Sequence, residues 1–155
     1  MTFVATDPQS HNGNNVWLTP LDLIKSVGEF DLDPCGELHW PTARTIYTKE
    51  MNGLKNNWFG RVWLNPPYGK EINPFLDKMK LHNNGVVLVF ARPDVWWWQA
   101  LYKDAKAVFA IKGRVKFHKV DGSTLHNAGV GSCLFFFGEV IRPNIKGIFL
   151  KGEEL

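Results

Sequence analysis

Hydrophobic residues follow two different periods along the chain. In "EINPFLDKMKLHNNG", Phe75, Leu76 and Met79 fall at helical spacing, and Gly85 follows as a stop signal. The next stretch, "VVLVFA" at residues 86–91, is continuously apolar and bounded by turn residues. Such a run is typical of a strand that is buried on both faces of a sheet. The pattern therefore predicts a helix followed by a central strand.

The same criteria predict further elements on either side of this pair. A short helix is predicted in "LTPLDLIKSVG", with Thr19 as N-cap and Pro20 at the first helical position, and a longer helix in "PDVWWWQALYKDA". Strands are predicted in "EFDLDPCG", "RVWLN", "KAVFAI", "RVKFHK" and "SCLFFFG". Successive helical residues are about 100° apart, so the tryptophans at 96–98 cannot share one face. We expect two of them in the core and one that covers the functional site or lies near its macromolecular partner.

Strands that alternate with helices and are followed by a run of strands define the expected fold class. The order predicts a three-layer α/β domain with a mainly parallel sheet and an antiparallel edge. With 155 residues, 45% of them hydrophobic, the chain can build one core and is too short for two ordinary domains. We therefore expect a single domain over residues 1–155, with the glycine-rich segment 120–132 as its longest loop.

Charge and cysteine content narrow the function classes. The net charge of +3 permits a polyanionic partner but is far below that of a protein that binds nucleic acid by charge alone. Cys35 and Cys133 form no CxxC motif and the five histidines show no zinc-ligand spacing, so we expect neither a disulfide nor a metal. No stretch approaches the roughly 18 apolar residues of a membrane span, and no signal peptide is evident. A cytoplasmic protein without a membrane partner is expected.

Polar residues follow two of the predicted strands, in "FDLDPCG" and "VWLNPPYG". Ligands of open α/β sheets bind beyond the carboxyl ends of parallel strands. Pro66 forces Asn65 into an extended conformation, and neither Pro66 nor Pro67 has an N–H group. The Asn65 side-chain oxygen and the Pro66 carbonyl are thus two acceptors for the hydrogens of one planar NH₂ group, and Tyr68 could cover the attached ring.

The sequence Asn65-Pro66-Pro67-Tyr68 resembles the motif of amino-group methyltransferases. The wider pattern "WLTPLDLI", "FDLDPC", "GRVWLNPPYG", "ARPDVWW" and "GRVKF", in this order, is similar to the small phage-type, Dam-like DNA N6-adenine methyltransferases. The resemblance spans residues 17–138. It implies a Rossmann-like methyltransferase fold, S-adenosylmethionine as methyl donor, and the N6 amino group of a flipped adenine in DNA as acceptor. It also suggests a phage or prophage product of a bacterial cytoplasm, linked to restriction and modification.

The resemblance assigns roles on the substrate side. It implies that Asn65 and Pro66 stabilise the charge that develops on the amine, while Tyr68 stacks on the flipped base. Phe117 in "GRVKF" is similar to the second aromatic residue of the family, and would cover the opposite face of the base. Arg92 follows a buried strand at its ligand end. The predicted catalytic residues are Asn65, Pro66, Pro67 and Tyr68, and the predicted substrate-binding residues are Tyr68, Phe117, Arg92 and Lys116.

A second set of residues is expected to bind the methyl donor. A carboxylate can pair with the ammonium group or the ribose hydroxyls of S-adenosylmethionine, which makes Asp33 the first choice and Asp31 the second. The resemblance adds Thr19 and Pro20, and leads us to expect an acidic residue where Asn52 stands. The predicted cofactor-binding residues are Thr19, Pro20, Asp31, Asp33, Pro34, Cys35 and Asn52.

Other interpretations of these residues stay open at this point. Asn-Pro-Pro could be a simple strand-ending turn, Asp31 could be solvated or could cap an element, and Phe117 could belong to the core. Arg92 could pair with Asp94 to hold a loop. Two rival functions are methylation of a glutamine side chain in a protein, which also presents a planar NH₂ group, and an inactive module that binds DNA or cofactor. The DNA target sequence and the oligomeric state are not predicted.

Overall fold

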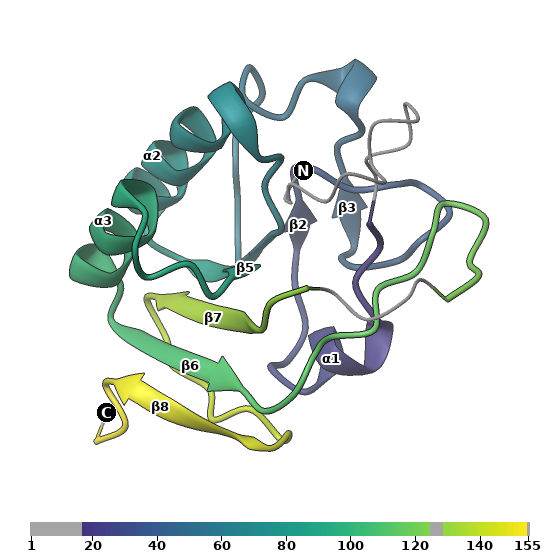
Figure 1. The fold of residues 1–155 in the computed structure, drawn as a ribbon. Helices are drawn as coiled ribbons and strands as arrows, with labels where there is room; N and C mark the ends of the chain where they lie inside the picture. Colours follow the sequence, from purple (N-terminus) through teal and green to yellow (C-terminus); the bar gives the residue numbers. More distant parts are fainter. Residues whose placement is uncertain (1–16, 125–128, 155) are drawn as a thin grey trace.

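The computed structural model describes residues 17–124 and 129–154, and within them a mixed sheet of seven strands dominates the fold (Figure 1). The strands follow the order β3-β2-β4-β5-β7-β6-β8 across the sheet. Their bounds are β2 Leu32–Asp33, β3 Thr45–Ile46, β4 Val62–Leu64, β5 Gly85–Phe90, β6 Ala107–Ile111, β7 Ser132–Phe137 and β8 Gly147–Lys151. The predicted α/β class is confirmed.

Strands β7 and β8 run opposite to the other strands of the sheet. Strands β3, β2, β4 and β5 pair in parallel. Strand β6 has the same direction, because β5 and β6 both pair antiparallel with β7. Strand β8 is the antiparallel edge that was expected, but β7 also runs antiparallel and lies inside the sheet. The chain between β6 and β7 contains no helix in its described part, and an antiparallel return needs no crossover helix.

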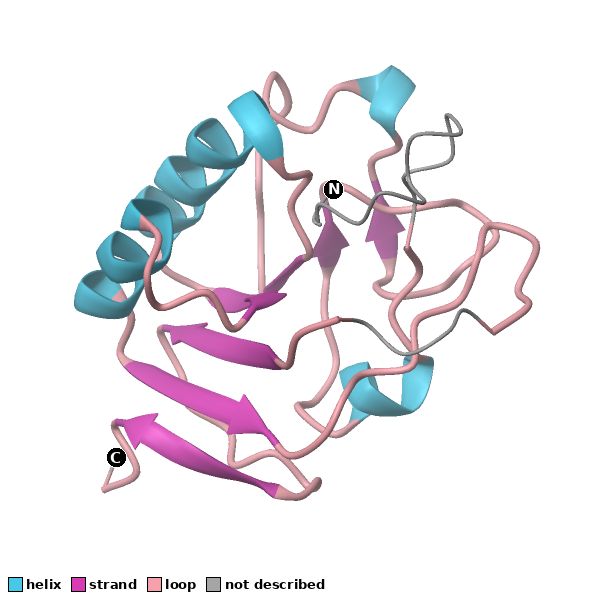
Figure 2. Ribbon diagram, viewed as in Figure 1, coloured by secondary structure: helices cyan, strands magenta, loops and turns pink. Residues whose placement is uncertain are grey.

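Two long helices cover one face of the sheet. Helices α2 (Ile72–His82) and α3 (Trp96–Asp104) lie side by side on this face (Figure 2). Their buried residues, such as Met79 and Leu101, pack into one core cluster with Val87 of β5. The opposite face is covered by the five-residue helix α1 (Leu21–Lys25) and by extended chain. Because the second helical layer is so reduced, the three-layer Rossmann-like arrangement stays a prediction.

Several predicted elements differ from the structure. Helix α1 has Pro20 as its N-cap, whose carbonyl accepts hydrogen bonds from the N–H groups of Leu23 and Ile24, so the N-cap role predicted for Thr19 is wrong. "RVKFHK" is not a strand but an extended segment with isolated bridges at His118. The sequence pattern did not predict β3 or β8. Strand β3 has only two residues, and β8 is a largely exposed edge strand, so neither shows a clear apolar pattern.

The three consecutive tryptophans of α3 point in different directions, as the helical rotation requires. Trp98 is buried, Trp97 is half-buried against the same core, and Trp96 is 66% exposed. The expected loop 120–132 is only partly described, since residues 125–128 lie outside the described residues. Within the described part of the chain, no helix is both long and apolar enough to cross a membrane.

Candidate active site

Three of the predicted site residues lie at the carboxyl ends of three neighbouring parallel strands. Strand β2 pairs with β4, and β4 pairs with β5. Asp33 ends β2, Asn65 directly follows β4, and Arg92 follows β5 by two residues. Short loops after parallel strands are where α/β sheets hold their ligands. The two polar turns found in the sequence are therefore neighbours in space.

The Asn65 side chain is held by a residue from a distant part of the chain. Its Nδ2 donates to Thr19 Oγ1 at 3.4 Å, although 46 positions separate the two residues. With Nδ2 used in this way, Asn65 Oδ1 accepts no hydrogen bond from any described residue. Pro66 beside it is buried, while Pro67 is half-buried. The arrangement leaves an amide oxygen available as an acceptor next to a backbone that offers no N–H group.

Tyr68 is fixed to the end of β5 by both its ring and its hydroxyl. Tyr68 Oη accepts a hydrogen bond of 2.8 Å from the Phe90 N–H group. The two rings are stacked with centroids 5.4 Å apart and only 6° between their planes, and Trp97 contacts Tyr68 at a tilt, with centroids 5.8 Å apart. Burial raises the pKa of the Tyr68 hydroxyl well above its ordinary value. The hydroxyl therefore stays protonated, and one face of the ring is occupied by Phe90.

Asp33 has a buried carboxylate at the carboxyl end of β2. The residue is 3% exposed; its Oδ1 accepts from the Cys35 N–H group at 2.9 Å and its Oδ2 from the Thr42 hydroxyl at 2.5 Å. Burial raises the pKa of Asp33 to about 6, against the effect of these two hydrogen bonds and with a smaller contribution from Glu37. Among the described residues no cation forms an ion pair with Asp33. A buried carboxylate without a counter-ion is costly, and a cationic ligand would lower that cost.

Two glycines pack closely against the turn that follows β2, Gly36 against the Asp33 side chain and Gly53 against the Pro34 carbonyl. A Cβ atom on Gly36 would lie 2.8 Å from Asp33 Oδ2, and a Cβ atom on Gly53 would lie 2.2 Å from the Pro34 carbonyl oxygen. Pro34 is buried and Cys35 is half-buried. Burial raises the pKa of the Cys35 thiol well above its ordinary value, so this thiol stays neutral. Side chains larger than hydrogen at Gly36 or Gly53 would displace the turn that carries Asp33.

Thr19 connects the two turns. It is buried, its hydroxyl accepts from Asn65, and its backbone carbonyl accepts from Trp40 Nε1 at 2.7 Å. Pro20, next to it, caps α1. The segment that contains Trp40 also contains Thr42, the partner of Asp33. The N-terminal segment that the resemblance assigned to the cofactor side is thus linked directly to the Asn65 turn and, through the segment of Trp40 and Thr42, to Asp33.

Two of the predicted cofactor-binding residues, Asp31 and Asn52, use their side chains in contacts within the protein. Asp31 precedes β2 and so lies at the opposite, amino-terminal end of that strand. Its oxygens accept from the Arg61 N–H group and from Arg44 Nη1, each at 2.8 Å, and chiefly the Arg61 hydrogen bond lowers the pKa of Asp31. Asn52 is the left-handed C-cap of a 3₁₀ turn (η2, Lys49–Met51), and its Oδ1 accepts from the Leu54 N–H group. Both side chains have evident structural roles.

The predicted substrate-binding residues occupy different depths. Phe117 is 4% exposed and packs against Phe90 and Trp17, with ring centroids 6.1 and 5.4 Å away, so it belongs to the core behind Tyr68. Arg92 lies at the end of β5, where its Nε is 4.0 Å from the Asp94 carboxylate. Lys116 is exposed. Phe117 thus contacts Phe90, the ring on which Tyr68 stacks.

Three residues that position the site were not predicted from the sequence, and a fourth, Trp97, is the one of the three tryptophans at 96–98 that lies at the site. Phe90 and Trp97 contact Tyr68, Trp40 binds the Thr19 carbonyl, and Thr42 binds Asp33. Phe90 could have been found, because it is the last residue of the apolar strand whose carboxyl end faces the site. The segment that contains Trp40 and Thr42 has no regular pattern, and no sequence signal indicated their partners.

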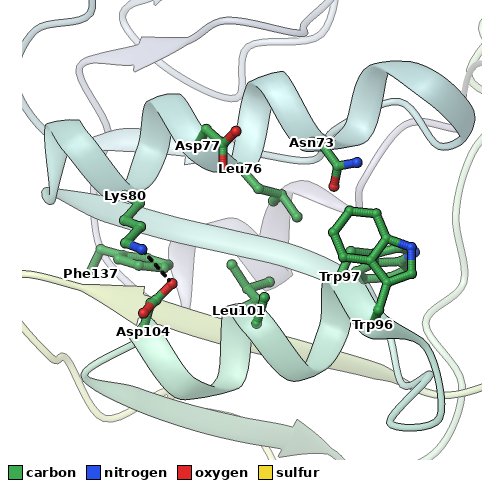
Figure 3. A pocket seen from close by; sticks show the side chains of 10 residues that line it. Asn73, Leu76, Asp77, Lys80, Trp96, Trp97, Leu101, Asp104 and Phe137 are labelled. Carbon is green, nitrogen blue, oxygen red and sulfur yellow. Dashed lines mark ion pairs between the residues drawn. The ribbon is translucent and has the colours of Figure 1, made fainter.

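A small cavity between α2 and α3 is a separate feature (Figure 3). Its volume is about 50 Å³, and Lys80 and Asp104 form an ion pair of 3.0 Å at one end while Asn73 and Trp96 lie at the other. Ligand pockets usually enclose about 300 Å³ or more, so this cavity cannot hold a nucleoside. Within the described residues, no group of three or more His, Cys, Asp or Glu side chains could hold a metal ion.

A protein-family model described as DNA N-6-adenine-methyltransferase (Dam) matches residues 8–150. The chain belongs to this family. The match covers both the Asn65 turn and the Asp33 turn of the Dam-family chain, and it confirms the resemblance found in the sequence. Membership of the Dam family makes this protein a DNA methyltransferase. No match was found among curated proteins or among solved structures.

Proposed function

We propose that this Dam-family protein transfers a methyl group from S-adenosylmethionine to the N6 amino group of an adenine that is flipped out of DNA. The observation that carries the proposal is the position of the Asn65 turn, fixed by Thr19, beside the buried carboxylate of Asp33. The family match supports DNA as the substrate and methyl transfer as the reaction. It does not favour a protein glutamine as the acceptor.

The Asn65 turn has the chemistry that an aromatic amine requires. The lone pair of such an amine is delocalised into the ring, which makes the nitrogen a weak nucleophile. Asn65 Oδ1 and the Pro66 carbonyl can accept the two N–H hydrogens and so stabilise the positive charge that develops on nitrogen during transfer. Tyr68, held by Phe90, offers a ring surface for the flipped base. No general base is needed first, because the proton can leave after the methyl group has been transferred.

The Asp33 turn fits the methyl donor. S-adenosylmethionine carries a sulfonium and an ammonium group, and when bound it supplies an electrophilic methyl group. Asp33 is a buried carboxylate without a described cationic partner, so it is suited to the ammonium group. Pro34 and Cys35 follow Asp33 in the same turn, and Thr19, which precedes Pro20, binds Asn65. Asp31 is left out of the proposed donor site, because it precedes β2 and its side chain is bound to Arg44 and Arg61. Asn52 stays a candidate, since the adjacent Gly53 packs against the Pro34 carbonyl of the Asp33 turn.

A simple experiment tests the proposed reaction in cells. DNA from bacteria that express the protein is digested to nucleosides and analysed by mass spectrometry for N6-methyladenine, with a host that lacks its own adenine methylation. We expect N6-methyladenine with the natural chain and none above background with Asn65→Ala. Methylated glutamine in host proteins, without N6-methyladenine, would instead favour the protein-directed alternative. An absence of both products would favour an inactive module.

The affinity for S-adenosylmethionine should depend on pH through Asp33. The ionised carboxylate binds the cation, and the pKa of Asp33 is raised to about 6 in the free protein. Affinity should therefore fall as the pH drops below 6, by about tenfold between pH 7 and pH 5. Isothermal titration calorimetry at both pH values measures this. The natural chain should show the dependence, and Asp33→Asn should bind weakly at both pH values.

Thermal melting of Asp33→Asn without ligand is the control for folding. Because the folded pKa of Asp33 lies above its ordinary value of 3.8, the ionised carboxylate reduces the stability of the ligand-free protein progressively as the pH rises through 6. Asp33→Asn should therefore melt at the same or a higher temperature than the natural chain at pH 8. A variant that melts much lower, or that keeps normal affinity, would assign Asp33 a purely structural role.

A further inference from the structure

The segment that follows β6 has a regular inside-outside pattern although it is not a strand. Val115 and Phe117 are buried at 6% and 4% exposure, while Arg114 and Lys116 between and beside them are exposed. Two backbone hydrogen bonds between His118 and Leu18 fix the end of the segment. The Leu18 N–H donates to the His118 carbonyl at 2.8 Å, and the Leu18 carbonyl accepts from the His118 N–H at 2.9 Å. The core anchors therefore hold the two cationic side chains outward.

The charged side chains of this segment are all positive. Residues 112–120 contain four Lys and Arg residues and no Asp or Glu. Neither Arg114 nor Lys116 forms an ion pair with any described residue. The next acidic residue along the chain, Asp121, accepts two hydrogen bonds from Ser123. A pair of outward cations on a fixed backbone is thus available for an anionic partner.

The segment borders the candidate active site. Strand β6 runs in the same direction as β5, so the carboxyl ends of both strands lie on the same side of the sheet (Figure 1). Phe117 packs against Phe90, on which Tyr68 stacks. Arg114 Nη1 lies 3.8 Å from the position of a Cβ atom on Gly131, and the Gly131 carbonyl accepts from the Ala91 N–H group at 2.8 Å. The Arg114 guanidinium therefore lies close to the end of β5, and Lys116 follows it by two residues on the same exposed side of the segment.

We propose that Arg114 and Lys116 bind two phosphates of the DNA strand beside the flipped adenine. Residues two positions apart in extended chain are about 6.6 Å apart, so the two cations can meet different phosphates of one strand. Such contacts hold the duplex in register without reading its sequence. The inference rests on the proposed function and deepens it: the sequence pointed to Lys116 as a substrate residue, and the structure adds Arg114 and assigns both to the DNA backbone.

The salt dependence of DNA binding tests this assignment. Binding of the full chain to a fluorescently labelled duplex is measured by anisotropy between about 50 and 200 mM salt. Each phosphate contact contributes about 0.9 to the slope of log K against log salt. Arg114→Gln and Lys116→Gln should each lower the slope by about one, and the double variant by about two. In steady-state methylation the double variant should raise the KM for DNA more than it lowers kcat.

Lys106→Gln is the matched control. Lys106 is also exposed, but it directly precedes β6 and so lies at the opposite end of the same strand. Its replacement should leave the slope unchanged, and the affinity for S-adenosylmethionine should be normal in all variants. An unchanged slope in the double variant, or an equal loss in Lys106→Gln, would overturn the phosphate assignment. Failure of the proposed function is distinct, because then the natural chain itself produces no N6-methyladenine.

Discussion

Replacement of Asn65 with alanine is expected to lower the rate of methyl transfer by about a hundredfold or more, the usual loss for one preorganised transition-state hydrogen bond. The side-chain oxygen that the replacement removes is the acceptor held in place by the Thr19 contact. Affinity for S-adenosylmethionine should survive, since the proposed donor site centres on Asp33. Single-turnover methylation with excess protein measures the chemical step without interference from product release.

Asn73→Ala provides the control for the loss of an amide at this end of the sheet. Asn73 lies at the start of α2 and lines the small cavity between α2 and α3, where no chemistry is proposed (Figure 3). This variant should methylate DNA at the normal rate. If Asn65→Ala keeps more than about a tenth of the natural rate, Asn65 does not stabilise the transition state in the way proposed.

Replacement of Tyr68 with alanine is expected to remove base stacking worth about 1–3 kcal/mol, and thus to weaken productive DNA binding as well as the rate. Tyr68→Phe keeps the ring but removes the hydrogen bond between the Tyr68 hydroxyl and the Phe90 N–H group. That variant should melt at a lower temperature, because one such hydrogen bond contributes about 0.5–1.5 kcal/mol to stability. It should still stack on the flipped base. The structure thus separates the roles of the ring and the hydroxyl.

A DNA duplex that contains an adenine analogue with fluorescence on unstacking distinguishes these roles. We expect Tyr68→Phe to hold the flipped base nearly as well as the natural chain, and Tyr68→Ala to lose most of this ability. Tyr102→Phe is the matched control, because the Tyr102 hydroxyl donates to the Leu150 carbonyl, away from the site. If Tyr68→Phe is as impaired in base flipping as Tyr68→Ala, the hydroxyl matters more than the ring, and the stacking role is wrong.

The sequence predicted those elements whose buried residues follow a regular pattern. Strand β5 is buried along its whole length, and α2 buries Phe75, Leu76 and Met79 at helical spacing, so both gave strong patterns. The segment around Phe117 gave a false strand signal. Its alternation is real, but the inward side chains pack on the face of the sheet while the backbone pairs only at His118. An alternating pattern reports burial, and burial does not require a sheet partner.

The location of the candidate site was predicted better than its members. Both polar turns were expected at the carboxyl edge, because strand ends in parallel sheets meet there. The sequence ranked Asp33 above Asp31 but offered both as donor-binding residues. In the structure Asp31 precedes the two-residue strand β2 and Asp33 ends it, and only Asp33 is buried at the proposed site. The contact between Thr42 and Asp33 depends on the path of an irregular loop. No periodicity encodes such a contact, so only the structure could reveal it.

Transfer of a radioactive methyl group in vitro tests the central claim most directly. Purified protein is incubated with long duplex DNA and methyl-labelled S-adenosylmethionine, and the DNA is then digested and its nucleosides separated. We predict label in N6-methyladenine with the natural chain, and at least about a hundredfold less with an Asn65→Ala variant that still binds the donor. Label in another nucleoside, label on the protein alone, or equal N6-methyladenine with Asn65→Ala would contradict the assignment of this turn as the site of methyl transfer.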